Sequence, residues 1–298
     1  MHDAVGRKIE QFVAELGTDD ARRLLEHLPA GKRLRARLIL TISGTDLRAV
    51  KTAAIVEMIH AASLLHDDVL DAAYVRRGRP SINATFGNKT AILFGDLLYA
   101  KGFYELSGID RNVAQVVSEA VVRLSMGERR DMLLAAAFNT DRDAYMEMID
   151  LKTAALIQAS AEAAALLAGK PRAPYRTYGR NLGIAFQMID DLLDITEDAA
   201  TLGKPAMHDF VEGKTTLPYI DLYAALNLTD RARLAGMHAR PLRAGDAAWI
   251  RTQMASHHII ERARAEARTW IQEAIDLMQQ AGEPALEAMA QSMIERSF

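Results

Sequence analysis

Two clusters of aspartates have the spacing that most directly indicates chemistry in this chain. The first cluster, Asp67, Asp68 and Asp71, ends a mostly apolar segment. Residues three and four apart share one face of a helix, so the three carboxylates converge on one patch. They repel one another, most strongly near a helix C-terminus, where exposed carbonyl groups already carry partial negative charge. Either water solvates this acidic helix end, or it binds a hard cation such as Mg²⁺, which prefers carboxylates, water and substrate phosphates.

The second cluster, Asp190, Asp191 and Asp194, repeats the same spacing on another apolar segment. This repetition favours metal binding over a solvated helix end, because acids that project from two helices of a bundle can meet in one cavity. Two facing acid clusters need several cations between them. An anionic ligand would then balance the cations, and a diphosphate that bridges Mg²⁺ ions fits the charges better than a single carboxylate.

Basic residues stand at breakers and predicted helix ends along the same stretch of chain. Arginine suits bidentate contacts with phosphate, and lysine suits point-charge contacts. Next to two metal-type clusters, they indicate two phosphate-bearing substrates. A nucleotide is disfavoured, because no Gly-x-x-x-x-Gly-Lys-Ser/Thr sequence follows a predicted strand. The basic residues are Lys32, Arg33, Arg35, Arg76, Arg77, Arg79, Lys152, Lys204 and Lys214.

The segments that must position these residues have helical periodicity. Apolar residues recur at steps of three and four, and no run alternates with period two for long enough to indicate a sheet. Glycine and proline separate the periodic segments, without a long linker or an internal repeat. We therefore predict an all-α protein with a single domain over residues 1–298. The main predicted helices cover residues 50–70, 91–106, 113–134, 145–167, 182–195 and 250–278.

Composition excludes several other classes of protein. The 298 residues carry a formal net charge of −3 and include no cysteine. A nucleic-acid partner is disfavoured, because such domains usually have a clear basic excess. Without cysteine there is no disulfide, no Cys-ligated zinc and no thiol nucleophile. The apolar runs are too short for a membrane span and the N-terminus lacks a secretory signal, so we expect a cytoplasmic protein without stable membrane insertion.

From Gly31 to Pro218, the order of these motifs resembles that of trans-isoprenyl diphosphate synthases of the polyprenyl synthetase family. The run from Leu65 to Gly95 is most similar to long-chain octaprenyl and hexaprenyl diphosphate synthases. The resemblance implies an all-α, isoprenoid-synthase-type helical bundle around a deep central cavity, usually in a homodimer. One departure concerns the family's Gly-Gly-Lys-Arg-x-Arg-Pro stretch, in which the first glycine and the proline are replaced by Ala30 and Ala36. The departure affects the local turn geometry more than the charged residues.

The resemblance also implies roles for individual residues. About three Mg²⁺ ions would hold the allylic diphosphate on Asp67, Asp68, Asp71, Asp190 and Asp194. The side chains around that diphosphate would be Arg76, Lys152, Thr153, Gln187, Lys204 and Lys214. Isopentenyl diphosphate would lie on Lys32, Arg35, His60 and Arg77. The residues expected to be catalytic are Asp67, Asp68, Asp71, Lys152, Asp190, Lys204 and Lys214.

The implied reaction is a head-to-tail (1'-4) condensation of isopentenyl diphosphate with an allylic diphosphate, either farnesyl or geranyl diphosphate. Metal ions and cationic side chains would stabilise the departing diphosphate, so that the allylic C–O bond ionises in a water-poor cavity. The alkene of isopentenyl diphosphate then attacks the carbocation, and proton loss gives a chain five carbons longer. By the resemblance, the released diphosphate is the base, and we assign no protein nucleophile.

The small residues Ala62 and Ser63, one turn before Asp67, are expected to line the wall of the product cavity and to set chain length. In the family, an aromatic residue at this level stops growth at short products. We therefore predict a C30 to C40 all-trans product, with octaprenyl diphosphate favoured. Release of so long an apolar product predicts peripheral contact with a membrane surface.

Four alternatives stay open at this stage. A shorter-chain farnesyl or geranylgeranyl diphosphate synthase would keep the reaction and change the product. A non-catalytic subunit of a heteromeric synthase commonly lacks one acid motif, whereas both are intact here. A terpene cyclase would have an Asn/Ser/Glu triad in place of the second motif. An HD-type phosphohydrolase would use the pair His66 and Asp67 but leave the second motif unexplained.

Overall fold

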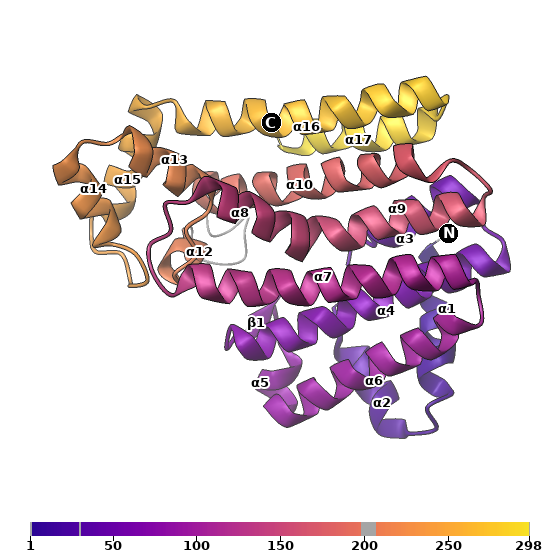
Figure 1. The fold of residues 1–298 in the computed structure, drawn as a ribbon. Helices are drawn as coiled ribbons and strands as arrows, with labels where there is room; N and C mark the ends of the chain where they lie inside the picture. Colours follow the sequence, from indigo (N-terminus) through magenta and orange to yellow (C-terminus); the bar gives the residue numbers. More distant parts are fainter. Residues whose placement is uncertain (1, 30, 198–206, 298) are drawn as a thin grey trace. The chain divides into compact units, whose positions relative to one another are not determined.

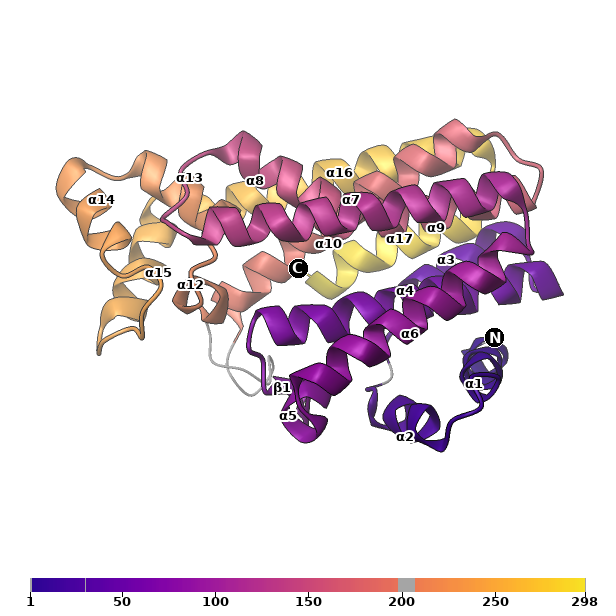
Figure 2. The same ribbon diagram turned by 60° about the horizontal axis from the view of Figure 1, so that its bottom comes forward.

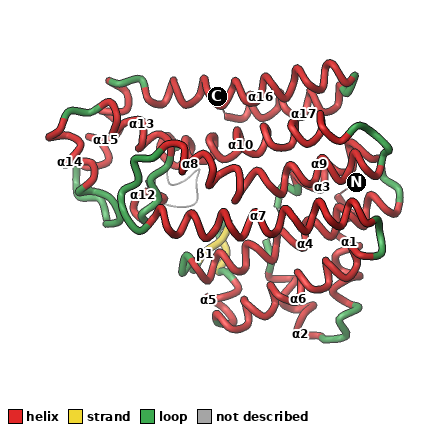
Figure 3. The backbone as a smooth tube through the Cα atoms, in the orientation of Figure 1, coloured by secondary structure: helices red, strands yellow, loops and turns green. Residues whose placement is uncertain are grey.

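The computed structural model describes residues 2–29, 31–197 and 207–297, which divide into two compact units. The first unit comprises Met1–Val121 and Leu156–Arg176, and the second comprises Val122–Ala155 and Thr177–Phe298. Regular structure in the described ranges is almost entirely helical (Figure 3). The structure therefore confirms the all-α prediction.

The first unit is built around the long helix α4, which runs alongside α6 and also packs against α1 and α3 (Figure 1). Figure 2 shows the short helix α2 next to α1 at the start of the chain. The elements are α1 (His2–Ala14), α2 (Asp19–His27), α3 (Leu34–Ser43), α4 (Leu47–Leu70), β1 (Val75–Arg76), β2 (Arg79–Pro80), α5 (Ile82–Phe86), α6 (Asn88–Ser107), and parts of α7 (Arg111–Ala135), α9 (Ala155–Leu167) and α10 (Arg172–Thr196).

Helix α4 begins and ends where its sequence supplies suitable caps. The side chain of Asp46 accepts a hydrogen bond of 2.8 Å from the backbone N–H of Ala49, which satisfies one of the free donors at the helix start. The central residues 53–56 are all buried, as is typical of a helix that is apolar on every face and lies inside a core. At the other end Asp71 is the C-cap, so the first aspartate motif lies on the last turn of a well-anchored helix.

A two-stranded hairpin follows this helix and was not predicted from the sequence. Strands β1 and β2 pair antiparallel, with Val75 opposite Pro80. Between them Arg77 and Gly78 both have positive φ angles, 52° and 73°. Two consecutive residues with positive φ are characteristic of a type I′ turn. Strands of two residues are too short to produce an alternating pattern, which explains why periodicity did not reveal them.

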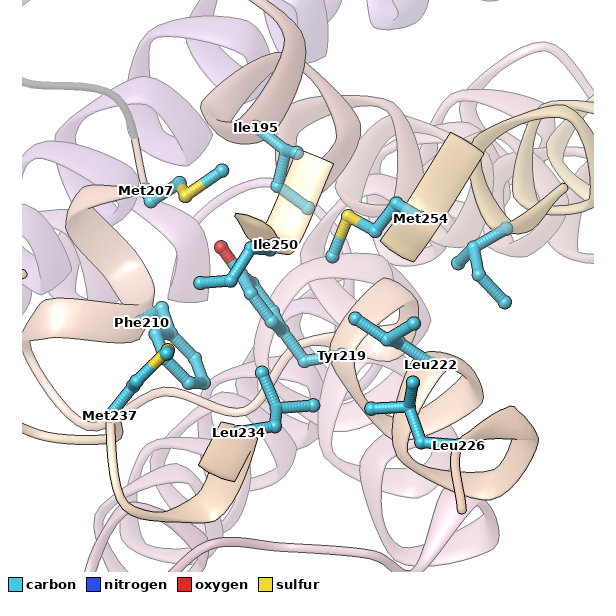
Figure 4. Packing of buried hydrophobic residues seen from close by; sticks show 11 residues of the cluster. Ile195, Met207, Phe210, Tyr219, Leu222, Leu226, Leu234, Met237, Ile250 and Met254 are labelled. Atoms are coloured by element: carbon cyan, nitrogen blue, oxygen red, sulfur yellow. The ribbon is translucent and has the colours of Figure 1, made fainter. Parts of the chain in front are cut away.

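The second unit contains the remaining helices and the second aspartate motif on α10. Its core includes Phe210 and Tyr219, whose rings stack with centroids 4.2 Å apart (Figure 4). This stack fixes the backbone on both sides of Lys214. The elements are the later parts of α7 and α10 and the first residue of α9, with α8 (Arg142–Ile149), the π-helical turn η1 (Asp150–Ala154), α12 (His208–Val211), α13 (Leu217–Ala225), α14 (Leu228–Ala235), α15 (Asp246–Ser256), α16 (Ile259–Ala281) and α17 (Pro284–Ser297).

Two predicted helices are interrupted. The segment 145–167 contains the π-helical turn η1, which separates α8 from α9. The segment 250–278 breaks between α15 and α16, where His258 has a φ of 53°. Neither break contains glycine or proline, and the apolar period continues across both, so no local feature of the sequence indicated them. In the described ranges, no helix combines the length and the hydropathy needed to cross a membrane.

Candidate active site

The three carboxylates of the first motif differ in exposure although they are close in sequence. Asp71 is exposed and Asp67 is half-buried, whereas Asp68 is buried. The backbone N–H of Asp71 donates a hydrogen bond of 2.8 Å to the carbonyl oxygen of Asp67, so the two residues lie one turn apart. This spacing places Asp67 and Asp71 on one face of the helix end, as predicted.

Asp68 pairs with an arginine from the hairpin. The Nε and Nη2 atoms of Arg76 each lie 2.7 Å from Oδ1 of Asp68. Burial raises the pKa of Asp68, and Arg76 only partly offsets this effect. The side-chain amide of Asn83 donates to the backbone carbonyls of Asp68 and Ala73, at 3.1 and 3.0 Å. Asp68 and Arg76, both predicted to contact metal or diphosphate, thus hold the hairpin onto α4.

Two of the residues predicted to bind isopentenyl diphosphate, Arg35 and Arg77, lie near a third, His60. Burial lowers the pKa of His60 well below its usual value, and the neighbouring Arg35, Arg77 and Arg76 lower it further. The imidazole is therefore neutral near pH 7. Burial also lowers the pKa of Arg35 to about 10, although Glu57 acts in the opposite direction. Three guanidinium groups lie near a neutral imidazole, and two of them have an acidic neighbour, Asp68 at Arg76 and Glu57 at Arg35. The site therefore keeps a net positive charge.

The backbone after α2 completes this positive site. Nη1 of Arg77 donates a hydrogen bond of 3.3 Å to the carbonyl oxygen of Pro29. A Cβ atom at Gly31 would lie only 2.7 Å from the same nitrogen, so the glycine retained from the family pattern leaves room for Arg77. Lys32 is exposed. Ala30, where the sequence departs from the family pattern, lies outside the described residues.

A pocket opens beside this site within the first unit. Its walls include His27, Ala61, Leu64, Asp68, Arg76 and Arg77. Glu57 also belongs to this region, because it accepts a hydrogen bond of 2.9 Å from the backbone N–H of Ala36 and lies near Arg35. Neither Glu57 nor His27 was predicted from the sequence to belong to a site. Glu57 lies on α4, seven residues before Leu64, and in the sequence it is one acidic residue among apolar ones, a pattern equally typical of a surface side chain.

The second motif carries one exposed and two buried carboxylates. Asp190 is exposed, whereas Asp191 and Asp194 are each 2% exposed. Asp191 accepts hydrogen bonds from the hydroxyl of Tyr145 and, at 2.9 Å, from the side-chain amide of Gln187. Burial raises the pKa of Asp191 well above its usual value, although the bond from Tyr145 opposes this effect.

The same hydrogen-bond chain reaches a residue predicted to flank the allylic diphosphate. The hydroxyl of Thr153 donates to Oε1 of Gln187 at 2.7 Å. Because Asp191 holds the amide nitrogen of Gln187, the amide oxygen must point toward Thr153. Thr153, Gln187, Asp191 and Tyr145 therefore form one chain, and two of them were predicted as site residues from the sequence.

Lys152, another predicted site residue, is held by two carboxylates of α7. Its Nζ atom lies 2.7 Å from Oε2 of Glu128 and 2.6 Å from Oδ2 of Asp131. Burial alone would lower the pKa of Lys152, but Asp131 and Glu128 outweigh burial and raise it. The ammonium group is charged and oriented. Glu128 and Asp131 were missed, although buried acids three apart on an apolar helix were a usable signal.

The chain that follows the second motif returns to Asp194. The backbone N–H of Met207 donates to the carbonyl oxygen of Asp194 at 2.7 Å, and the N–H of Asp209 donates to its carboxylate at 3.3 Å. Asp209 adds a further negative charge near Asp191, which sequence analysis did not predict. Lys214 lies close by on the chain, with Nζ 3.7 Å from Glu212. Lys204 lies outside the described residues.

The oxygen donors of both motifs suit Mg²⁺. Asp67 and Asp71 in the first unit and Asp190 in the second are accessible carboxylates, which are hard ligands for a hard cation. No group of three or more potential ligands is already assembled in the parts of the chain that the structure describes. Mg²⁺ commonly takes its other ligands from water and substrate phosphates. The motifs lie in different units, and their predicted opposition stays a prediction.

The predicted chain-length residues are both buried. Ala62 is fully buried and Ser63 is 4% exposed. The hydroxyl of Ser63 donates a hydrogen bond of 2.9 Å to the carbonyl oxygen of His60, one turn earlier. Their role in setting chain length stays a prediction.

Comparisons with known proteins show the family of this chain. The family model described as Polyprenyl synthetase matches residues 20–248. An all-trans-nonaprenyl-diphosphate synthase (geranyl-diphosphate specific) from Rhodobacter capsulatus is 43% identical over 198 residues, which are 64% of this chain and 61% of that protein. The chain thus spans less than two thirds of that relative's length.

Solved structures extend the likeness over the whole chain. An octaprenyl pyrophosphate synthase from Helicobacter pylori is 40% identical, with a TM-score of 0.93 over 98% of this chain and 97% of that one. A polyprenyl synthase from Caulobacter crescentus CB15, complexed with calcium and isoprenyl diphosphate, is 30% identical, with a TM-score of 0.89 over 100% of this chain and 95% of that one.

Proposed function

The chain belongs to the polyprenyl synthetase family, and from this membership we propose that it condenses isopentenyl diphosphate with an allylic diphosphate into a long all-trans polyprenyl diphosphate. The named relatives include synthases of octaprenyl and nonaprenyl products, which supports a long product. The allylic primer in this proposal is farnesyl or geranyl diphosphate. The prediction that residues 1–298 form a single catalytic domain is part of the same proposal.

The observation that carries the proposal is the positive site around His60. Arg35 and Arg77 lie beside a neutral imidazole, and Nε of Arg35 is buried without a hydrogen-bond partner among the described residues. A buried guanidinium N–H without a hydrogen-bond partner is costly unless a ligand supplies an acceptor. A diphosphate provides several oxygens for bidentate contacts with arginine. We assign isopentenyl diphosphate to this site, with Lys32 as a further cation at its edge.

The other diphosphate is assigned to the two acidic motifs. Asp67 and Asp71, with Asp190 and Asp194, are the residues that would hold Mg²⁺, and the ions number about three in this proposal. Bound Mg²⁺ would supply positive charge that stabilises a diphosphate leaving group. Asp68 is placed differently, because it holds Arg76 and thereby orients an arginine next to the first motif.

Side chains of the second unit complete the proposed allylic site. Lys152 and Lys214 would contribute positive charge to the departing diphosphate, and Lys204 is assigned the same role from the resemblance alone. Thr153 and Gln187, with their dipoles fixed by the hydrogen-bond chain, would face the electron-poor allylic carbon. Preorganised dipoles of this kind stabilise developing charge without reorganising during the reaction. The released diphosphate would take the final proton.

The partner in the proposed assembly is a second copy of this chain. Helix α6 exposes large apolar side chains at Leu93, Leu97 and Tyr104, which are 62%, 44% and 72% exposed. Their spacing of four and seven residues places them in one stripe on the helix surface. A contiguous exposed apolar stripe is typical of a protein–protein interface. We propose a homodimer that uses this stripe, in the cytoplasm, with contact at a membrane surface during product release.

Incubation of the purified chain with farnesyl diphosphate, labelled isopentenyl diphosphate and Mg²⁺, with and without EDTA, tests the proposed function. We expect a metal-dependent ladder of products that ends at C30 to C40 after dephosphorylation and chromatography. A ladder that stops at C15 or C20 from a shorter primer would keep the reaction and reject the long product. No elongation would favour a non-catalytic subunit, and an activity recovered only with a second protein would establish that alternative.

A further inference from the structure

The π-helical turn η1 lies between α8 and α9 and carries two of the residues assigned to the allylic site. Lys152 and Thr153 are both within its bounds, Asp150–Ala154. A π-helical turn has one residue more per turn than an α-helix, which shifts the following side chains around the axis. Such turns are rare and frequently found at functional sites. What fixes this turn therefore also fixes the direction of the two side chains.

Two glycines from neighbouring helices lie directly against the backbone of this turn. A Cβ atom on Gly127 of α7 would lie 2.3 Å from the backbone nitrogen of Lys152 and 2.6 Å from its Cα. A Cβ atom on Gly183 of α10 would lie 2.5 Å from Cα of Ala154 and 2.8 Å from its Cβ. These separations are far below ordinary van der Waals contact. Both helices therefore approach the turn as closely as they do only because these positions have no side chain.

Backbone conformation does not explain the two glycines. Neither Gly127 nor Gly183 is among the residues with positive φ, so any amino acid could adopt their helical geometry. Glycine in a helix interior destabilises the helix, and its presence there usually has a packing reason. Space for the turn is that reason at both positions.

Polar side chains on the same faces of α7 and α10 contact the turn on both sides of each glycine. From α7, Arg123 lies 3.0 Å from Asp150, and Asp131 lies 2.6 Å from Lys152. Arg123, Gly127 and Asp131 are spaced four residues apart and share one face of α7. Along this face of α7 an arginine, a glycine and an aspartate follow one another, and the backbone of the turn packs against the glycine.

Helix α10 presents a matching row. Nε of Arg180 lies 2.7 Å from Oδ1 of Asp150, and Gln187 accepts a hydrogen bond of 2.7 Å from Thr153. Gly183 lies between them at spacings of three and four residues, which again share one face. Every side chain in both rows contacts a residue of the same five-residue turn. The two glycines determine how close these polar groups come to it.

We propose that Gly127 and Gly183 are positioning residues of the prenyl transfer reaction, which set the depth of the turn and thereby aim the Lys152 ammonium at the allylic diphosphate and the Thr153 hydroxyl oxygen at the allylic carbon. This inference rests on the proposed function. An added methyl group at either position would push the turn away by about 1 Å, and a displacement of that size at a reacting centre can cost about 100-fold in rate.

The test compares Gly127→Ala and Gly183→Ala with Gly102→Ala in single-turnover reactions. Gly102 is a buried helical glycine of α6 whose Cβ would meet Ile59 at 3.4 Å, an ordinary contact, so this variant controls for the loss of glycine itself. The enzyme is mixed in excess with an allylic primer, labelled isopentenyl diphosphate and Mg²⁺. The amplitude of the first condensation counts the intact sites, and the rate constant reports the chemistry at each site.

We expect the rate constant to fall about 100-fold in both test variants, while the amplitude, the circular dichroism spectrum and the KM for isopentenyl diphosphate stay near those of the parent. Gly102→Ala should keep the parental rate constant. In Gly183→Ala combined with Ala154→Gly, part of the rate should return, because the double variant removes the contact between the two Cβ atoms.

Three results would overturn the inference. A parental rate constant with reduced amplitude would show that the glycines only support folding, and so would the complete unfolding of both variants. An equal loss in Gly102→Ala would remove the connection with the turn. An inactive parent chain would instead reject the proposed function, which keeps the two failures distinct.

Discussion

Arg76 holds Asp68 through two contacts of 2.7 Å to a single carboxylate oxygen, Oδ1. Asp68 stands between Asp67 and the exposed Asp71 in sequence, yet its side chain is buried against the hairpin. Identical residues in one short motif therefore have different partners. We infer that Asp67 and Asp71 serve the metal ions, whereas Asp68 serves the loop that carries Arg76 and Arg77.

Replacing the first two aspartates should separate these roles. In Asp67→Ala we expect kcat to fall by at least about 100-fold with little change in thermal stability, because the lost carboxylate is partly exposed. In Asp68→Ala we expect a loss of about 1–3 kcal/mol in the free energy of unfolding, because Arg76 loses its partner. Urea unfolding and steady-state kinetics measure both effects. Equal stability of the two variants would contradict the assignment.

Removal of the Tyr145 hydroxyl should lower kcat although this side chain is buried. In Tyr145→Phe, Asp191 loses one of its two hydrogen bonds, and the orientation of Gln187 becomes less fixed. We expect kcat to fall by about 10- to 100-fold, the usual range for residues that orient a site residue. Tyr178→Phe is a matched control, because that hydroxyl donates to the carbonyl oxygen of Leu286 instead. Similar kinetics in both variants would rule out the specific role of Tyr145.

His60 should make the folded protein less stable in acid. Burial and the neighbouring arginines hold the pKa of His60 well below 6.5, so the folded protein keeps this imidazole neutral while the unfolded chain binds a proton below that pH. Stability due to this group is therefore present above pH 6.5 and is lost as the pH falls further.

The measurement is the free energy of unfolding of the parent and His60→Gln between pH 8 and pH 5. Below pH 6.5 the parent should lose up to about 1.4 kcal/mol per pH unit more than the variant. Above pH 7.5 the two slopes should be equal, which provides the internal control. Parallel slopes over the whole range would show that the imidazole gains its proton as readily in the folded state.

The sequence predicted the site best where spacing along one helix was sufficient. Asp67 and Asp71 share a helix face because they are four residues apart, and the breaker after them correctly indicated the helix end. The resemblance then indicated that Arg35, His60 and Arg77 form one site, and the structure places both arginines near His60. Lys32, assigned to the same site, is exposed.

The residues that support the site were not predictable in the same way. Glu128 and Asp131 contact Lys152 across about 20 positions in sequence, and Tyr145 contacts Asp191 across 46. Periodicity shows which face of a helix is apolar, but it does not show which helices pack together or at what register. The π-helical turn was equally hidden, because it depends on the close approach of Gly127 and Gly183 and not on a local breaker.

Ala62 should control product length if it lines the product cavity. In Ala62→Phe, the added ring would occupy space that a growing chain needs, so we expect the product ladder to end several isoprene units earlier. Because Ala62 is fully buried, overpacking should also cost about 1–3 kcal/mol in stability. Ala62→Val introduces a side chain of intermediate size, and its longest product should lie between that of the parent and that of Ala62→Phe. An unchanged product length in a folded, active Ala62→Phe variant would exclude this position from the cavity wall.

The apolar stripe on α6 should determine the oligomeric state. Leu93, Leu97 and Tyr104 lie at spacings of four and seven residues and stay exposed in the single chain. Leu93→Glu would place a charge within the proposed interface between two copies. We expect light scattering after size-exclusion chromatography to give a dimer for the parent and a monomer for the variant. Leu228→Glu replaces a leucine that is 83% exposed on α14, outside the stripe, and should leave the dimer intact. A parent that elutes as a monomer, or a dimer that survives Leu93→Glu and Leu97→Glu together, would mean that the stripe serves another purpose.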